Sequence, residues 1–255
     1  MGRIYISPSD QWSNMGTNGH SEAEHCIKIA NEMSKILSMF GEEVLVGDSQ
    51  TECTYTERVA ESNYFNADVH FCIHTNASNG QARGSMVMTY PDSVNHPIIT
   101  SVNRRLENLT PTSDFGIIGR DDLYEITNTN ALCVYIEVDF HDNPQGEEFI
   151  DNNIYKIAEQ ISYGYIEGVG RGGEINGITI PESNELWIVQ AGAYSQIEYA
   201  NTLLGTLFSS GIDSFVFEEG GLYKVQCGAF SKQENAERKA EEIRNKGYSC
   251  FVRRK

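Results

Sequence analysis

The sequence predicts an α/β domain followed by a small α+β domain. Short apolar runs typical of strands alternate with amphipathic helical segments along residues 1–170, which indicates a mixed, mostly parallel sheet flanked by helices. The last part of the chain contains an internal repeat whose two copies predict the order βαββαβ. At about 100–200 residues per domain, 255 residues are enough for two domains that each bury a core.

The elements of residues 1–170 follow from the periodicity of the apolar side chains. Residues 4–6 form the first expected strand. Apolar side chains at helical spacing predict a helix over residues 22–39, which ends before Gly41. The alternation then predicts strands at 43–46, 69–73, 85–90 and 131–138, and helices at 57–66, 95–109 and 153–167.

A glycine-rich stretch separates the two expected domains. Residues 168–177 contain five glycines and precede Pro181. Ordering so many glycines costs backbone entropy, so this stretch is typical of a linker. We therefore expect one domain at residues 1–170, a linker at 171–182 and a second domain at 183–255.

The repeat lies in the second domain, where residues 187–195 (WIVQAGAYS) match residues 223–231 (YKVQCGAFS). Each copy consists of an alternating strand, a helix, a glycine stop and a second short strand. Two such units predict one four-stranded sheet backed by two helices. The repeat resembles the sporulation-related (SPOR) domain, and this resemblance implies a peptidoglycan-binding module that favours glycan strands stripped of their peptides.

Six side chains of this repeat are candidates for glycan binding: Trp187, Gln190, Tyr194, Tyr223, Gln226 and Phe230. Aromatic side chains also pack within sheets, and we expect packing to account for at least half of the four aromatics. Because strand positions alternate between the two faces of a sheet, some lie on the face away from the helices. There they can stack on sugar rings.

Composition excludes several classes of partner. The chain has 19 Lys and Arg against 36 Asp and Glu, a net charge of −17, so it lacks the cations that nucleic-acid binding needs. No apolar run approaches the ~18 residues of a membrane-spanning helix, so we expect no membrane insertion. The six cysteines show no metal or redox spacing, which favours free thiols in a reducing compartment.

Three polar residues of the first domain lie at positions where catalytic or metal-binding side chains are expected. His74 follows the apolar run 68–73, Glu137 ends the run 131–136, and Glu22 opens a helix. Loops at the carboxyl ends of parallel strands usually carry the sites of α/β proteins. Taken singly, Glu22 suits a helix N-terminus and His74 suits a hydrogen-bonded core position. Together, a histidine and glutamates with open positions are typical of catalytic zinc.

The motifs around these residues resemble those of the zinc-dependent N-acetylmuramoyl-L-alanine amidases over residues 1–170. Cys72–Asn76 matches the element [ST]-x-H-x-N with cysteine in the first place, and Glu137–Phe140 matches E-x-x-F. The resemblance implies that Glu22 and His74 bind zinc and that Glu137 is the catalytic carboxylate. It also implies cleavage of the amide between N-acetylmuramic acid and L-alanine of the stem peptide in the cell wall.

The first strand departs from the family pattern, which ends in D-P-G-H-G with a zinc-binding histidine. Here the stretch is Ile6-Ser-Pro-Ser-Asp-Gln11, without a histidine. Gln11 is the third ligand that the resemblance favours, and it offers a neutral carbonyl oxygen. Asp10, which aligns with the missing histidine, and His20, on a nearby glycine-flanked loop, are the alternatives.

Three further residues are candidates for the substrate cleft. Asn76 and Arg83 can orient substrate or satisfy backbone groups, and His141 can line the cleft or lie on a surface loop. Because the first domain carries nearly all of the excess negative charge, we expect the second domain to supply wall targeting through effective concentration.

Two other functions stay open from the sequence. One is a non-catalytic wall-binding protein that has lost zinc, and the other is a zinc hydrolase that cleaves within the stem peptide. Residues 1–6 show no secretion signal. We therefore expect cytoplasmic synthesis and action on the wall after release by lysis or through a holin.

Overall fold

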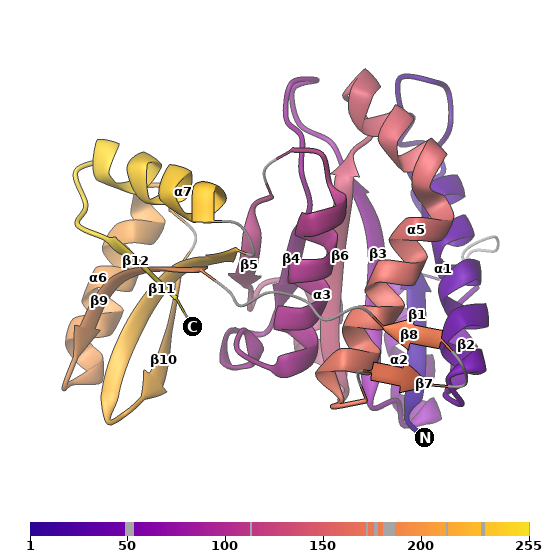
Figure 1. The fold of residues 1–255 in the computed structure, drawn as a ribbon, viewed down its shortest axis with the longest axis horizontal. Helices are drawn as coiled ribbons and strands as arrows, with labels where there is room; N and C mark the ends of the chain where they lie inside the picture. The colour runs from indigo at the N-terminus through magenta and orange to yellow at the C-terminus, as the bar shows by residue number, and fades with distance from the viewer. Residues whose placement is uncertain are drawn as a thin grey trace.

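A six-stranded sheet in the order β2-β1-β3-β6-β4-β5 forms the centre of the first domain (Figure 1). Its strands are β1 (Arg3–Pro8), β2 (Glu43–Val46), β3 (Val69–Asn76), β4 (Met86–Thr89), β5 (Gly116–Gly119) and β6 (Leu132–Phe140). Strands β2, β1, β3 and β6 are parallel, β4 is antiparallel to β6, and β5 is parallel to β4. The predicted mixed, mostly parallel sheet is therefore confirmed.

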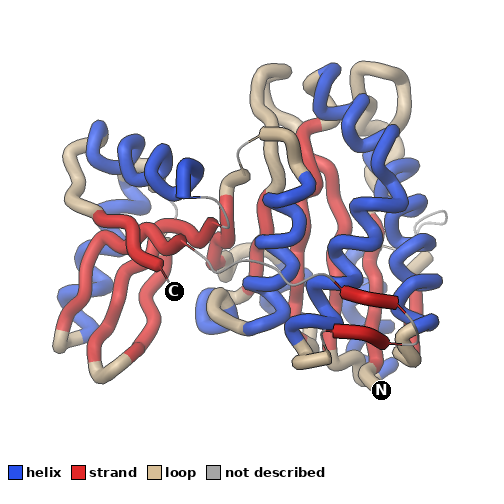
Figure 2. The backbone as a smooth tube through the Cα atoms, in the orientation of Figure 1, coloured by secondary structure: helices blue, strands red, loops and turns tan. Residues whose placement is uncertain are grey.

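The structure is a computed structural model that describes residues 1–48, 54–112, 114–171, 173–175, 178–180, 187–212, 214–230 and 233–254, without the side chains of 173–175 and 178–180. Helices lie on both faces of the first sheet (Figures 1 and 2). One face carries α1 (Glu22–Met39), α3 (Pro97–Leu109) and α5 (Pro144–Gly168), and the other carries α2 (Tyr55–Phe65), which packs against α4 (Tyr124–Asn128). A single 3-10 turn, η1 (Pro91–Ser93), follows β4. Strands β1 and β3 are buried along nearly their whole length because helices cover both faces.

The second domain has the predicted order βαββαβ. Its elements are β9 (Trp187–Tyr194), α6 (Ile197–Ser209), β10 (Phe215–Glu219), β11 (Leu222–Phe230), α7 (Gln233–Asn245) and β12 (Phe251–Arg254). The four strands form an antiparallel sheet in the order β10-β11-β9-β12. A separate antiparallel pair, β7 (Gly173–Ile175) and β8 (Ile178–Ile180), lies within the stretch that we expected to be a linker.

The structure adds elements that the apolar periodicity did not predict. Strand β5 and helix α4 are too short, at four and five residues, to show a period. Helix α5 begins at Pro144 instead of residue 153, since Asn143 caps it and Pro occupies its first turn. Asn153 lies inside α5 at a kink with a non-helical φ of −128°, which explains why the regular spacing starts only there.

The two domains pack on one another along β5 and α3. The side-chain amide of Asn103 donates to the carbonyl oxygen of Ala229 at 3.2 Å, and that of Asn235 donates to Glu107 at 2.8 Å. Ile188, Phe215 and Ala229 belong to the same apolar cluster as the core of the first domain. The contact is thus a continuation of the core.

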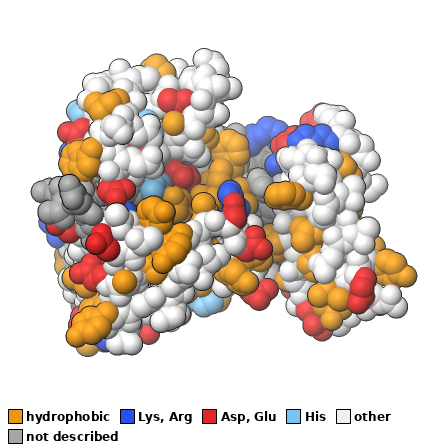
Figure 3. All heavy atoms as spheres, turned by 180° about the vertical axis from the view of Figure 1, so that it is seen from behind, with side chains coloured by type: hydrophobic (Ala, Val, Ile, Leu, Met, Phe, Trp, Pro, Cys, Tyr) orange, Lys and Arg blue, Asp and Glu red, His pale blue; other side chains and the backbone are white. Residues whose placement is uncertain are grey.

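Three findings bear on the composition. None of the helices in the described ranges combines the length and the apolar character that crossing a membrane requires. The five cysteines among the described residues are free thiols, and Cys72 and Cys133 are buried as expected. Asp and Glu side chains are spread over both domains on the face seen in Figure 3.

Candidate active site

The carboxyl ends of β3 and β6 and the start of α1 bring Glu22, His74 and Glu137 to one edge of the sheet. His74 and Glu137 are register partners on neighbouring strands. Ser21 caps α1 through a capping box, and the Glu22 backbone N–H donates to the Asn14 carbonyl at 2.9 Å. The loop between β1 and α1 is therefore tied down where the first glutamate of the helix enters the site.

Glu22 and His74 form a buried pair. The Nδ1 of His74 lies 2.7 Å from Oε1 of Glu22, and Nδ2 of Asn14 donates to Oε2 of Glu22 at 2.7 Å. The ring of His74 stacks on Tyr135 with centroids 4.6 Å apart. The carboxylate accepts a hydrogen bond from Nδ1. The second ring nitrogen, Nε2, is buried and has no hydrogen-bond partner among the described residues.

Hydrogen bonds and neighbouring charges shift the pKa values of Glu22 and His74 in opposite directions. Burial by itself would raise the pKa of Glu22, but hydrogen bonds from His74, Ser9 and Asn14 and the charge of His74 lower it. Burial by itself would lower the pKa of His74, but the hydrogen bond that His74 donates to Glu22 and the charges of Glu137 and Glu22 raise it. The pair attracts a proton to His74, and a cation competes for the same place.

Glu137 has a different electrostatic environment. Burial raises its pKa to about 7; the charge of His74 opposes this rise and that of Glu22 adds to it. Its Oε2 is buried and has no hydrogen-bond partner in the described part of the chain. A carboxylate that is poised near neutrality and free to exchange a proton is suited to acid–base chemistry.

The three candidates for the missing ligand lie in different surroundings. Asp10 pairs with the buried Arg58 at 3.2 Å, and Gln11 is exposed. Nδ1 of His20 lies 3.1 Å from Oδ1 of Asp151. The groups of three or more His, Cys, Asp or Glu ligands found among the described residues include neither Glu22 nor His74. The third ligand is therefore not placed by the geometry.

Two family models match the two domains of the chain. Residues 4–167 match the model described as N-acetylmuramoyl-L-alanine amidase, and residues 183–254 match the SPOR domain. The chain belongs to the N-acetylmuramoyl-L-alanine amidase family. A comparison with curated proteins finds none that matches.

Solved amidase structures share the fold of the amidase domain. The catalytic domain of CwlV from Bacillus (Paenibacillus) polymyxa var. colistinus is 21% identical, with a TM-score of 0.61, covering 67% of this chain and 99% of that one. AmiC2 of Nostoc punctiforme is 16% identical (TM-score 0.60; 66% and 97% covered). The catalytic domain of the CD27L endolysin targeting Clostridia difficile is 22% identical (TM-score 0.56; 66% and 98% covered).

The candidate substrate residues of the amidase domain have protein partners. Arg83 forms an ion pair with the buried Asp139, with Nη2 and Oδ2 2.9 Å apart. Asn76 accepts the N–H of Ala77 at 2.8 Å through its side chain. His141 is fully buried and its Nδ1 lies 2.8 Å from the hydroxyl of Thr75. The surface-loop alternative for His141 is therefore wrong, because the backbone of His141 also pairs with Asn76 beside β3.

Sequence reasoning missed several residues at the amidase site. Asn14 and Ser9 hold Glu22, and Tyr135 covers His74. Tyr135 carried a usable signal, since it stands two residues before Glu137 on the same strand and so on the same face. Asn14 and Ser9 carried none, because they lie in a loop without a period.

The six candidate glycan-binding residues of the SPOR domain divide by burial. Gln190, Gln226 and Phe230 are buried, whereas Trp187, Tyr194 and Tyr223 are half-buried and pack against the core of this domain. Oε1 of Gln190 accepts a hydrogen bond from Nε of Arg253 at 3.0 Å. The side-chain oxygen and nitrogen of Gln226 are both buried without a hydrogen-bond partner among the described residues. Tyr223 also lines a crevice of about 920 Å³ that separates β10 and α6 from η1 and the end of β5.

Proposed function

We propose that this amidase hydrolyses the amide between the lactyl group of N-acetylmuramic acid and L-alanine with the help of zinc, and that the SPOR domain targets it to the wall. The observation that carries the proposal is the convergence at one sheet edge of a Glu22–His74 pair and Glu137, whose Oε2 has no partner among the described residues. Family membership supplies the substrate class.

The side chains present fit a zinc ion. Nδ1 of His74 and Oε1 of Glu22 face each other at 2.7 Å, so an ion shared by the two would take the place of the proton between them. Oε2 of Glu137 is buried without a partner among the described residues, and such an atom is costly unless a ligand satisfies it. Glu22 and His74 would hold the metal, and we favour Gln11 as the third ligand. Asp10 and His20 already have the partners Arg58 and Asp151. When bound, zinc polarises a carbonyl oxygen and lowers the pKa of water.

Other residues of the site transfer the proton or hold the zinc-binding side chains in position. Glu137 removes a proton from the attacking water and returns it to the leaving amine, which its pKa of about 7 permits in both directions. Tyr135 holds the ring plane of His74 by stacking, and Asn14 fixes the carboxylate of Glu22. Because each of these groups is buried or braced, the site is preorganised before substrate arrives.

The SPOR domain supplies the wall affinity that the amidase domain lacks. The acidic amidase domain offers no long-range attraction to an anionic wall. Tyr223 and the crevice beside it offer partly exposed aromatic surface for sugar rings. We propose that the protein reaches its substrate after release from the cell in which it is made, by lysis or through a holin.

The test is the product of digestion. Purified protein is incubated with peptidoglycan, and released fragments are analysed for new amino termini by mass spectrometry. The proposal predicts stem peptides that begin with L-alanine, and zinc in the protein. Cleavage inside the stem would instead show a peptidase, and intact wall with bound protein would show the non-catalytic alternative.

The third ligand is assigned by variants. Gln11→Ala, Asp10→Ala and His20→Ala are compared with His74→Ala for both zinc content and amide hydrolysis. The variant that matches His74→Ala in both measurements carries the ligand. If Gln11→Ala keeps wild-type zinc and wild-type rate, Gln11 is not that ligand.

A further inference from the structure

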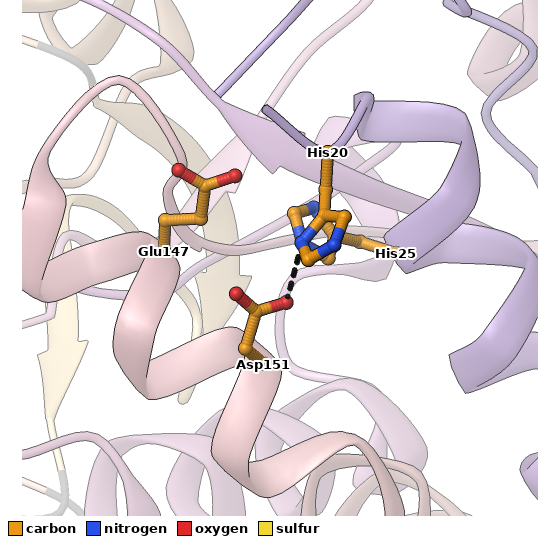
Figure 4. A group of neighbouring side chains, drawn as sticks. All are labelled: His20, His25, Glu147 and Asp151. Carbon is orange, nitrogen blue, oxygen red and sulfur yellow. Dashed lines mark hydrogen bonds and ion pairs between the residues drawn. The ribbon is translucent and has the colours of Figure 1, made fainter. Parts of the chain in front are cut away.

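A second group of ligand-type side chains lies between α1 and α5. His20 ends the loop before α1, His25 lies in α1, and Glu147 and Asp151 stand one turn apart on α5. Figure 4 shows both carboxylates on the side of α5 that faces the two imidazoles. One ligand atom from each of the four residues lies within 4.8 Å of all the others. Neither Glu22 nor His74 belongs to this group.

Two of the spacings already match those of a metal site. Oδ1 of Asp151 lies 3.1 Å from Nδ1 of His20 and 3.0 Å from Nε2 of His25. Ligand atoms at about 2.1 Å from a tetrahedral zinc ion stand about 3.4 Å apart. The most distant atoms of the group therefore need to approach one another by only about 1.4 Å at most.

Glu147 distinguishes a metal site from a set of side chains that only hydrogen-bond to one another. The residue is fully buried, and its Oε1 has no partner among the described residues. Its other oxygen accepts from the Thr17 hydroxyl at 2.7 Å and from the Asn18 N–H. A carboxylate held by one oxygen, with the other buried and unsatisfied, is costly unless a cation or proton reaches it.

The loop that holds Glu147 is built closely around it. A Cβ atom at Gly16 would lie 2.2 Å from Oε1 of Glu147, so any larger residue there would displace the carboxylate. The Gly16 N–H donates to the carbonyl of His20 at 2.8 Å, which closes the loop over the carboxylate. The loop that carries His20 therefore also fixes the position of the Glu147 carboxylate.

We propose that His20, His25, Glu147 and Asp151 form a second metal site, for a divalent transition-metal cation and for zinc in particular. Two imidazoles and two carboxylates are a donor set that zinc accepts, and the two carboxylates balance its charge. The ion would join the loop before α1 to α1 and α5. Its role is structural: it fixes the loop through which the chain passes from Gln11 to Glu22.

The test is zinc stoichiometry on the full chain. Wild type, Asp151→Asn, His74→Ala and Glu148→Gln are each saturated with zinc, freed of unbound metal and analysed by mass spectrometry for zinc per chain. Asp151 is only partly buried, so its isosteric variant should fold. Glu148→Gln is the matched control. Glu148 is exposed on α5 and lies outside the four-residue group, and its substitution removes the same charge as Asp151→Asn. Thermal unfolding with and without added zinc is measured on all four proteins.

We expect wild type and Glu148→Gln to bind two zinc ions, and Asp151→Asn and His74→Ala to bind one each. Zinc should raise the Tm of His74→Ala but raise that of Asp151→Asn less. If Asp151→Asn binds as much zinc as wild type, the four residues are a hydrogen-bonded brace and the second site does not exist. If instead His74→Ala binds as much as wild type while Asp151→Asn loses an ion, the second site stands and the zinc of the proposed active site fails.

Discussion

Replacing Glu137 by glutamine tests the proton-transfer role most directly. The substitution keeps the size of the side chain and removes the group whose pKa is raised to about 7. A positioned general base contributes about 10²–10⁴ in rate, which corresponds to about 3–6 kcal/mol of transition-state stabilisation at about 1.4 kcal/mol per tenfold. We therefore expect Glu137→Gln to lower kcat by that factor and to keep the zinc held by Glu22 and His74.

The pH dependence gives the same prediction a second readout. Glu137 acts as a base only when ionised, so the rate of the wild type should rise as pH increases through the pKa of Glu137. A bound cation lowers the pKa of a nearby carboxylate, so the midpoint should lie at or below about 7. Release of amino groups from peptidoglycan is measured from acidic to basic pH, with zinc content checked in parallel. A Glu137→Gln protein within a few-fold of the wild-type rate would refute the assignment.

Three other predictions concern packing, charge and metal. Gly164→Ala should lower the midpoint of urea unfolding, because its Cβ would lie 2.7 Å from Cα of Val102 and overpacking of about 1–3 kcal/mol exceeds the helix-propensity gain. Gly205→Ala has nothing within 4 Å of its new Cβ, so it should raise the free energy of unfolding by up to about 1 kcal/mol and with it the urea midpoint. Arg83→Met should destabilise the protein by about 3 kcal/mol, since it leaves Asp139 buried without its cation; unchanged stability with a raised KM would restore the substrate role. Chelation should abolish amide hydrolysis and added zinc should restore it, and full activity after verified zinc removal would contradict the metal requirement.

The long elements of the fold could be predicted because their apolar patterns are long. Helix α1 and the buried strands β3 and β6 show several periods each, and their ends place Glu22, His74 and Glu137. The short elements β5 and α4 could not be predicted, since four or five residues define no period.

The site was predictable only where a motif lies on a regular element. Glu22, His74 and Glu137 meet because parallel strands end at one edge of the sheet. The ion pair of Arg83 with Asp139 and the burial of His141 depend on pairings between residues far apart in the chain. No local pattern encodes such pairings, and the same holds for the loop that carries the missing ligand.

The shared core along β5 and α3 has a consequence for how the two domains would act together on the cell wall. Ile188, Phe215 and Ala229 are buried in the apolar cluster of the amidase domain, so the sheet of the SPOR domain turns together with the catalytic edge. A tether would let the enzyme search a sphere around its anchor point. If the SPOR domain binds glycan as proposed, a domain packed in this way would restrict hydrolysis to stems at a set distance from the bound sugar.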